Sequence, residues 1–213
     1  MGHYILGGGV IKLVERDYEI LRMIYRFRFC LSRHILYLTS FNGARACDRR
    51  LKLLVDSGYL KRKKILYGIP YLYYLSTNGM RLIHVNVKKE NIRIDQIHHD
   101  IAILDCLKKL IEKYQFQLDG MVTERELHIQ DGFGIRKHHP DIVFKKNDES
   151  FAIEVELNLK AKDRLLRNIE ENYLNYDYQI WVIPNTQIKI RNILKESVNK
   201  YDNIEVISLE CLL

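Results

Sequence analysis

The sequence has little of several features that define whole classes of protein. It contains no run of 18 apolar residues and no charged segment followed by an apolar one at its start, so neither a membrane span nor a secretory signal is expected. Only three residues are proline and 11 are glycine, which excludes collagen-like and low-complexity architectures. The four cysteines show no Cys-x-x-Cys spacing, which argues against a zinc module or a disulfide framework and favours the reducing cytoplasm.

What the chain does have is an uneven distribution of charge around a net value of +7. Residues 1–96 carry 18 Lys and Arg against 7 Asp and Glu, or +11, whereas residues 97–213 carry 16 against 20, or −4. A cationic excess confined to one half predicts a surface for a polyanion there. We therefore expect two domains of different chemistry, at residues 1–85 and 97–213, joined by a polar connector at 86–96.

In the basic half, the spacing of the apolar residues changes from a helical to a strand-like pattern along the chain. Apolar residues at helical spacing predict three helices, and a period of two beyond Gly58 predicts a β-hairpin. Three helices followed by a hairpin are typical of a winged helix-turn-helix domain. The expected elements are helices over 16–29, 33–39 and 44–56 and strands over 59–64 and 71–75.

The third helix and the hairpin carry the candidate DNA-binding residues. Because Cys47, Leu51 and Leu54 form the buried stripe of that helix, its cations are expected to point outward. In a winged helix the third helix enters the major groove of duplex DNA and the wing holds the phosphate backbone. The alternative is a solvated cationic face without a partner. The candidate DNA-binding residues are Arg45, Arg49, Arg50 and Lys52 on the helix and Lys61, Arg62, Lys63 and Lys64 on the hairpin.

The acidic half mixes strand and helix patterns, which predicts an α/β domain with a mixed sheet and covering helices. The neighbouring His98 and His99 diverge on a helix, so a structural role is favoured over a metal site. The expected strands are 114–118, 121–129, 141–144, 151–157, 179–183 and 204–208, with a loop at 130–139 and helices over 97–113, 160–176 and 186–200.

Three acidic residues on two adjoining strands are predicted to lie close together. Strand alternation places Glu154 and Glu156 on one face, and the hairpin returns Asp141 to the same neighbourhood. Carboxylates gathered on a partly buried face are costly without a cation, so the pattern favours a hard divalent ion such as Mg²⁺ or Mn²⁺. The alternative is a solvent-exposed face of the strand, on which Glu154 and Glu156 pair with Lys145 or Lys146.

These residues resemble a known pattern. Pro140-Asp141, followed after twelve residues by Glu154-Val155-Glu156, is similar to the PD-(D/E)xK nuclease signature. With the basic half included, the chain resembles the plasmid replication-relaxation family, which is related to the MobC-type relaxases of mobilisable plasmids. The likeness is also carried by residues 16–21, 26–29, 49–60, 123–127 and 139–141, and by Lys160 and Arg164.

The resemblance implies a winged-helix DNA reader joined to a restriction-endonuclease-like domain, in a protein of a plasmid or another mobile element. It matches Asp141, Glu154 and Glu156 to metal-binding and catalytic positions, with Glu124 as an assisting metal ligand. Glu156 stands where the simplest signature has a lysine, so Lys160 would supply the catalytic lysine.

The sequence thus leaves three functions open. The first is a Mg²⁺- or Mn²⁺-dependent nickase that binds double-stranded DNA, as a homodimer, during replication, relaxation or mobilisation. The second is a non-catalytic replication or transcription regulator whose second domain serves dimerisation. The third is a relaxase with a tyrosine nucleophile, for which Tyr173 and Tyr176 are candidates that lack a recognisable histidine ligand cluster.

Overall fold

The chain divides between Ile97 and His98 into two units of mixed α and β structure. In the computed structural model, the described residues are 11–65, 67–87, 92–132, 137–159 and 161–213. Unit 1 denotes the described residues up to 97, and unit 2 denotes those from 98 onward. No helix within these ranges is long and apolar enough to cross a membrane.

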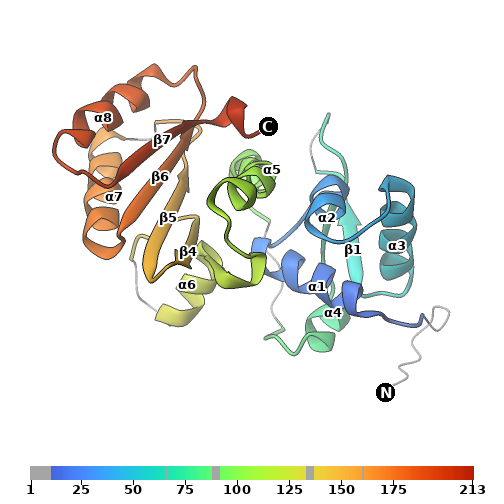
Figure 1. Cartoon of the computed structure of the whole chain (residues 1–213). Helices are drawn as coiled ribbons and strands as arrows, with labels where there is room; N and C mark the ends of the chain where they lie inside the picture. Colours follow the sequence, from blue (N-terminus) through green and yellow to red (C-terminus); the bar gives the residue numbers. More distant parts are fainter. Residues whose placement is uncertain (1–10, 66, 88–91, 133–136, 160) are drawn as a thin grey trace. The chain divides into compact units, whose positions relative to one another are not determined.

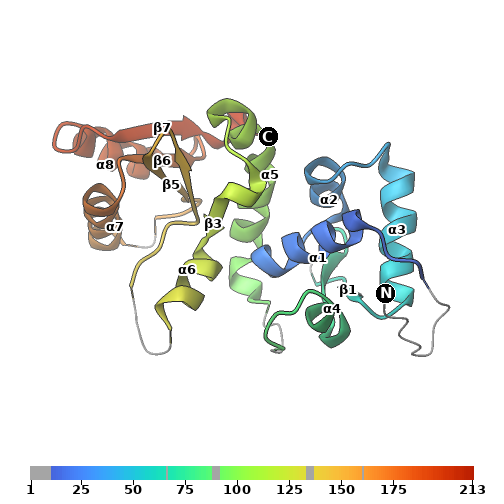
Figure 2. The ribbon, with the colours of Figure 1, turned by 60° about the horizontal axis from the view of Figure 1, so that its bottom comes forward.

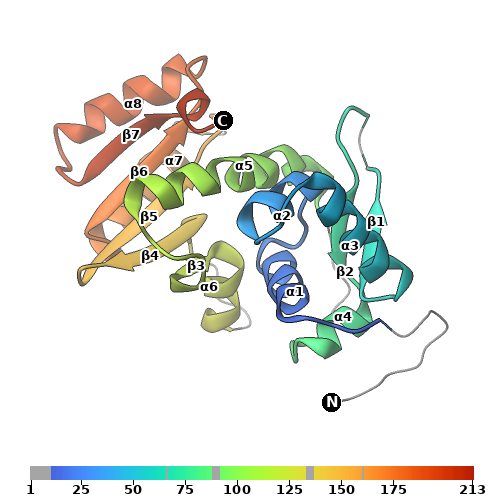
Figure 3. The same ribbon diagram turned by 45° about the vertical axis from the view of Figure 1, so that its right-hand side comes forward.

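Unit 1 contains helices and a two-stranded antiparallel hairpin, which Figure 3 shows with α1, α2 and α3 beside the strands. Gly58 has a φ of 76°, a conformation that favours glycine, and it turns the chain from α3 into the first strand. The elements are α1 (Glu15–Phe27), α2 (Ser32–Leu38), α3 (Ala44–Asp56), β1 (Leu60–Lys63), β2 (Leu72–Leu75) and α4 (Thr77–Leu82).

The core of unit 1 joins the helices to the hairpin. Cys30, which precedes α2, exchanges two backbone hydrogen bonds with Tyr73 of β2, with N···O distances of 3.0 and 2.8 Å. Gly79 lets α4 approach the hairpin, because a Cβ at this position would lie 2.2 Å from the carbonyl oxygen of Tyr59. The fully buried side chains come from α1, α2, α3, both strands and the segment between α1 and α2, and include Ile20, Leu21, Ile24, Phe29, Leu31, Ile35, Leu51, Leu54, Leu60 and Leu72.

Unit 2 is built on a five-stranded mixed sheet in the order β3-β4-β5-β6-β7. The first three strands are antiparallel neighbours, and β5, β6 and β7 are parallel because helices connect them. The elements are α5 (Ile97–Tyr114), β3 (Met121–Thr123), α6 (Glu124–Asp131), β4 (Ile142–Lys146), β5 (Glu149–Val155), α7 (Lys162–Asn175), β6 (Tyr178–Ile183), α8 (Ile188–Val198) and β7 (Ile204–Ser208).

Side chains cover both faces of this sheet. On one face, Trp181 of β6 packs in a buried cluster with Ile169 of α7 and Leu194 of α8, and Figure 1 shows these two helices on the same side of the strands. On the opposite face, Phe144 of β4 stacks on Phe151 of β5 with ring centroids 4.7 Å apart. Burial on both faces explains why β6 is almost wholly apolar.

Two expected strands are wrong. Residues 121–129 were expected to be extended, but β3 ends at Thr123 and α6 begins at the next residue. The Thr123 hydroxyl accepts from the Glu126 backbone N–H, and the Glu126 carboxylate accepts from the Thr123 N–H, which forms a capping box. The expected strand over 114–118 is likewise occupied by the end of α5 and the segment after it.

Candidate nucleic-acid interface and carboxylate–histidine cluster

The cations of α3 lie on its solvent-exposed side. Cys47, Leu51 and Leu54 are buried against the rest of unit 1, so the opposite side of the helix faces water. Arg45, Arg49 and Lys52 are exposed there, together with Asp48 and Asp56. The exposed side of α3 therefore carries both signs of charge, with the cations in excess.

Arg50 does not belong to this exposed side. Its Nε donates to Oδ1 of Asp17 on α1 at 2.7 Å, its Nη2 donates to the other carboxylate oxygen, and Nη2 also donates to the Lys12 carbonyl at 2.9 Å. Asp17 is 0% exposed, and a buried carboxylate requires a partner. The hydrogen bond that Arg50 donates to Asp17 raises the pKa of Arg50 despite the opposing effect of burial. The expectation that Arg50 contacts DNA is thus corrected: this guanidinium ties α3 to α1.

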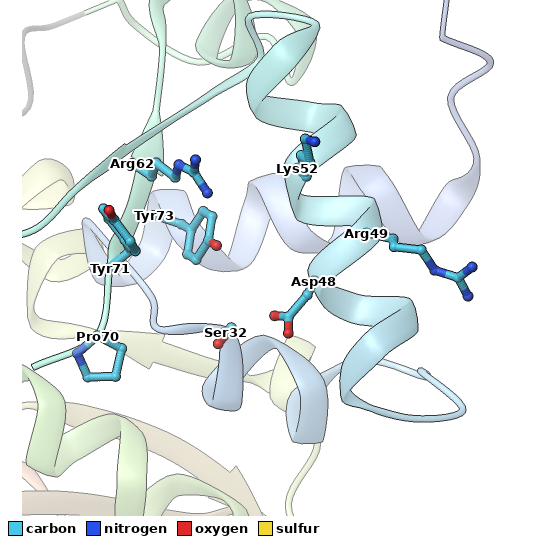
Figure 4. Close-up of a pocket in the computed structure, with 8 residues that line it drawn as sticks. All are labelled: Ser32, Asp48, Arg49, Lys52, Arg62, Pro70, Tyr71 and Tyr73. Atoms are coloured by element: carbon cyan, nitrogen blue, oxygen red, sulfur yellow. The ribbon is translucent and has the colours of Figure 1, made fainter.

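The hairpin adds four consecutive cations beside α3. Residues 61–64 are all exposed. Arg62 pairs across the strands with Tyr73, and its guanidinium lies 5.0 Å from the ring centroid of Tyr71. Burial raises the pKa of the Tyr73 hydroxyl, against the effect of its hydrogen bond with Arg62. These aromatic contacts hold the Arg62 head group in place, and Figure 4 shows Arg62 and Tyr73 pointing into the space between the hairpin and α3.

That space is an open hollow of about 430 Å³. Its lining combines cations from two elements with aromatic rings and one carboxylate, and it consists of Ser32, Asp48, Arg49, Lys52, Arg62, Pro70, Tyr71 and Tyr73. The name basic face is used below for the exposed cations Arg45, Arg49, Lys52, Lys61, Arg62, Lys63 and Lys64.

In unit 2, two of the predicted carboxylates lie near each other but are already paired. Asp141 accepts the Val155 backbone N–H through Oδ2 at 2.7 Å, and the same oxygen lies 3.5 Å from Nε2 of His99. Glu154 is 7% exposed, and its Oε1 contacts Nε2 of His138 at 2.7 Å and accepts from Asn172 of α7 at 2.9 Å. The alternative prediction placed Glu154 on a solvent-exposed face beside Lys145 or Lys146. It is wrong, because Glu154 is buried.

Burial and neighbouring charges shift the pKa values in this region. Burial raises the pKa of Glu154, and the charge of Asp141 raises it further. Burial alone would lower the pKa of His138, but its hydrogen bond and charge interaction with Glu154 raise it above the ordinary value. For His99, burial also acts downward, and the charge of Asp141 with hydrogen bonds to Asp100 and Asp141 raises the pKa to about 11. Each histidine thus favours its protonated form beside a carboxylate.

The other predicted ligands lie elsewhere. Strand β5 ends at Val155, so half-buried Glu156 follows the strand, and its N–H donates to the Val182 carbonyl at 3.0 Å. Glu124 is the first residue of α6, and its carboxylate lies 3.6 Å from Nε2 of His128. Lys160 lies outside the described residues.

A hard divalent cation does not fit the three predicted oxygen donors as they stand. Among the described residues, Asp141, Glu154 and Glu156 do not bring three ligand atoms within reach of a common point. One oxygen of Asp141 is committed to the Val155 N–H, and one oxygen of Glu154 is committed to a histidine and an amide. Mg²⁺ and Mn²⁺ prefer a cluster of oxygens rather than a carboxyl group already hydrogen-bonded to an imidazole and an amide.

The structure does assemble a different group, which the sequence analysis missed. His128, Asp131 and His139 each offer one ligand atom, and these atoms lie within 4.8 Å of one another. The only signal in the sequence was the i, i+3 spacing of His128 and Asp131, which becomes informative only once the segment is known to be helical. The name His–Asp–His cluster is used below for these three residues.

The tyrosine candidates for a nucleophile also have defined surroundings. Tyr176 is half-buried, and burial followed by the charges of Glu154 and Asp131 raises its pKa. A raised pKa disfavours the phenolate that a nucleophile requires. Tyr173 is exposed and packs against Tyr201 with ring centroids 4.8 Å apart. The surroundings of Tyr176 therefore do not activate its hydroxyl.

No family model, no curated protein and no solved structure matches this chain.

Proposed function

We propose that unit 1 binds duplex DNA through the basic face, with α3 in the major groove and the hairpin on the phosphate backbone. One observation carries the proposal: seven exposed cations, three on α3 and four on residues 61–64, gather on two elements that adjoin each other in the fold. We interpret the three helices, the hairpin and the backbone exchange between Cys30 and Tyr73 as a winged helix.

The chemistry of the basic face suits a polyanion. None of Arg45, Arg49, Lys52, Lys61 and Lys63 has a carboxylate partner among the described residues. Cations without internal partners are available to phosphates, and each contact releases counterions from the nucleic acid. Arg62, positioned by two tyrosine rings, loses less conformational freedom on binding than a free side chain would.

The proposal predicts an affinity that falls steeply with salt. Changing Arg45, Arg49 and Lys52 together to alanine should lower the steepness of the log Kd against log salt plot by about 2.7, since each phosphate contact contributes about 0.9. Fluorescence anisotropy with a labelled duplex measures this slope. Arg81→Ala is the matched control, because Arg81 is exposed on α4 outside the basic face. Equal slopes for the triple variant and the control would contradict the role of α3.

For unit 2, we propose a role in regulation or dimerisation in preference to metal-dependent nicking. The supporting observation is that Glu154, the central carboxylate of the nuclease-like pattern, is already bound to His138 and Asn172. Assignment to the replication-relaxation family, with a plasmid or mobile-element role, a homodimer and a cytoplasmic location, remains a prediction from the resemblance.

Supercoiled plasmid separates the two alternatives. If unit 2 has no nicking activity, the wild-type protein leaves the plasmid supercoiled with Mg²⁺, with Mn²⁺ and with chelator alike. Open-circle product that requires Mn²⁺ and disappears in Glu154→Gln would restore the nickase interpretation. Sedimentation of the full chain with and without duplex tests the predicted dimer.

A further inference from the structure

The His–Asp–His cluster is the densest group of metal-ligand side chains in the described part of unit 2. Nε2 of His139 lies 2.5 Å from Oδ2 of Asp131, and the His139 side chain is 5% exposed. The His128 ring meets the His139 ring edge-on, with centroids 4.7 Å apart and an interplanar angle of 77°. His128 itself is exposed, so one side of the cluster is open to solvent.

The backbone fixes these three side chains relative to one another. His128 and Asp131 are three residues apart on α6 and share a face of that helix. The start of α6 is held against the start of β4, because the Glu124 N–H donates to the Asp141 carbonyl at 3.0 Å. His139 is two residues before Asp141, and the chain therefore carries its ring back to α6. Figure 2 shows β3 leading directly into α6.

We propose that His128, Asp131 and His139 bind one divalent transition-metal ion of the zinc class. Two imidazole nitrogens and one carboxylate oxygen match a site for Zn²⁺, whereas Mg²⁺ favours oxygen ligands alone. A metal would take the place of the hydrogen bond between Nε2 of His139 and Oδ2 of Asp131, and both atoms would become ligands. Three protein ligands leave at least one coordination position for water on the exposed side.

This site is distinct from the Mg²⁺ or Mn²⁺ site that the acidic motif predicted. It contains none of Asp141, Glu154 and Glu156, and its softer donors select a different class of metal. Glu124 adds a positioning carboxylate, because its Oε1 lies 3.6 Å from Nε2 of His128 on the adjacent turn of α6. Such outer carboxylates orient a ligating imidazole, and their loss lowers metal affinity by about tenfold or more.

Titration of Zn²⁺ into the metal-free full chain tests the proposal. We expect one equivalent to bind and to raise the melting temperature, and Co²⁺ in its place to give visible d–d absorption. His128→Ala and Asp131→Asn should each weaken Zn²⁺ binding by about a hundredfold or more, at or above the upper end of what loss of an outer carboxylate costs. His139 is left unchanged because its ring is buried and its loss threatens folding.

Two matched variants make the result specific. His98→Ala removes an exposed histidine from α5 of the same unit, and Glu154→Gln alters the predicted oxygen site. Both should bind Zn²⁺ as the wild-type protein does. Absence of binding in the wild-type protein, or equal affinity in His128→Ala and His98→Ala, would overturn the proposal and leave His139 and Asp131 as a hydrogen-bonded pair without a metal. Loss of binding only in Glu154→Gln would overturn it in favour of the carboxylate site.

Discussion

The two units use charged side chains in opposite ways. In unit 1 the cations of the basic face project into solvent, and the buried ion pair between Arg50 and Asp17 stands apart from them. In unit 2 the carboxylates of Asp141 and Glu154 turn inward and lie against histidines.

The comparison distinguishes exposed charges, which the proposal assigns to a binding partner, from buried charges, which stabilise the fold. Exposed cations add little to stability, so their number on one face supports the proposed binding of a polyanion. Buried carboxylates are costly unless they are paired, so each histidine beside them is part of the structure of unit 2. A count of charges in the sequence cannot make this distinction, because it treats Arg49 and its neighbour Arg50 alike.

The largest expected effect comes from those two adjacent arginines. Arg50→Ala leaves the carboxylate of Asp17 buried without its partner and should lower the free energy of unfolding of unit 1 by about 3 kcal/mol or more. Arg49→Ala should change stability by less than about 0.5 kcal/mol, because Arg49 is exposed. Urea unfolding measures both. Equal stability of the two variants would contradict the separation between structural and partner-facing charge.

A smaller loss of stability is expected in unit 2 from Glu154→Ala. Removal of this carboxylate leaves the Asn172 amide and the His138 ring without their acceptor, which should cost roughly 1–3 kcal/mol. Glu170→Ala is the control, since Glu170 is exposed on α7. Thermal unfolding should distinguish the two. If both variants melt together with the wild-type protein, Glu154 is not part of the core of unit 2.

The pH dependence of unit 2 should carry the signature of His99. Its folded pKa of about 11 lies above the unfolded value of about 6.5, so its contribution is complete below pH 6.5 and disappears as the pH rises toward 11. The stability of unit 2 should therefore decline over this window. His99→Gln should flatten the decline, whereas His98→Gln, at the neighbouring exposed position, should leave it intact. Parallel pH profiles for the two variants would rule out the proposed pairing with Asp141.

The smallest effect is expected from Asp48, the one carboxylate in the hollow of unit 1. Asp48→Asn removes a negative charge among Arg49, Lys52 and Arg62 and should strengthen non-specific duplex binding a few-fold, with a larger gain at low salt. Asp56→Asn, at an exposed position on α3 outside the hollow, provides the comparison. Weaker binding by Asp48→Asn would indicate that this carboxylate contacts a base rather than repelling phosphate.

Local patterns predicted the parts of the fold that local forces determine. The bounds of α3 follow from its apolar stripe and from Gly58, and β7 follows from its β-branched residues. The helix α6 was not predicted because it is only 8 residues long and directly follows β3, so its capping box lies within a segment that favours extended structure. Side-chain hydrogen bonds between residues far apart in the sequence were not predicted either. Asp17 and Arg50 are 33 residues apart, and Glu154 and His138 are 16 residues apart.

The hairpin of unit 1 offers the most direct test of duplex binding by the basic face. The salt dependence of duplex affinity should be measured for the wild-type chain and for a variant with Lys61, Arg62, Lys63 and Lys64 changed to alanine. We predict that the slope becomes shallower by about 3.6 and that affinity at 0.1 M salt falls by about four thousandfold, from about 0.9 for each of four phosphate contacts. An unchanged slope and affinity in this variant would contradict the account.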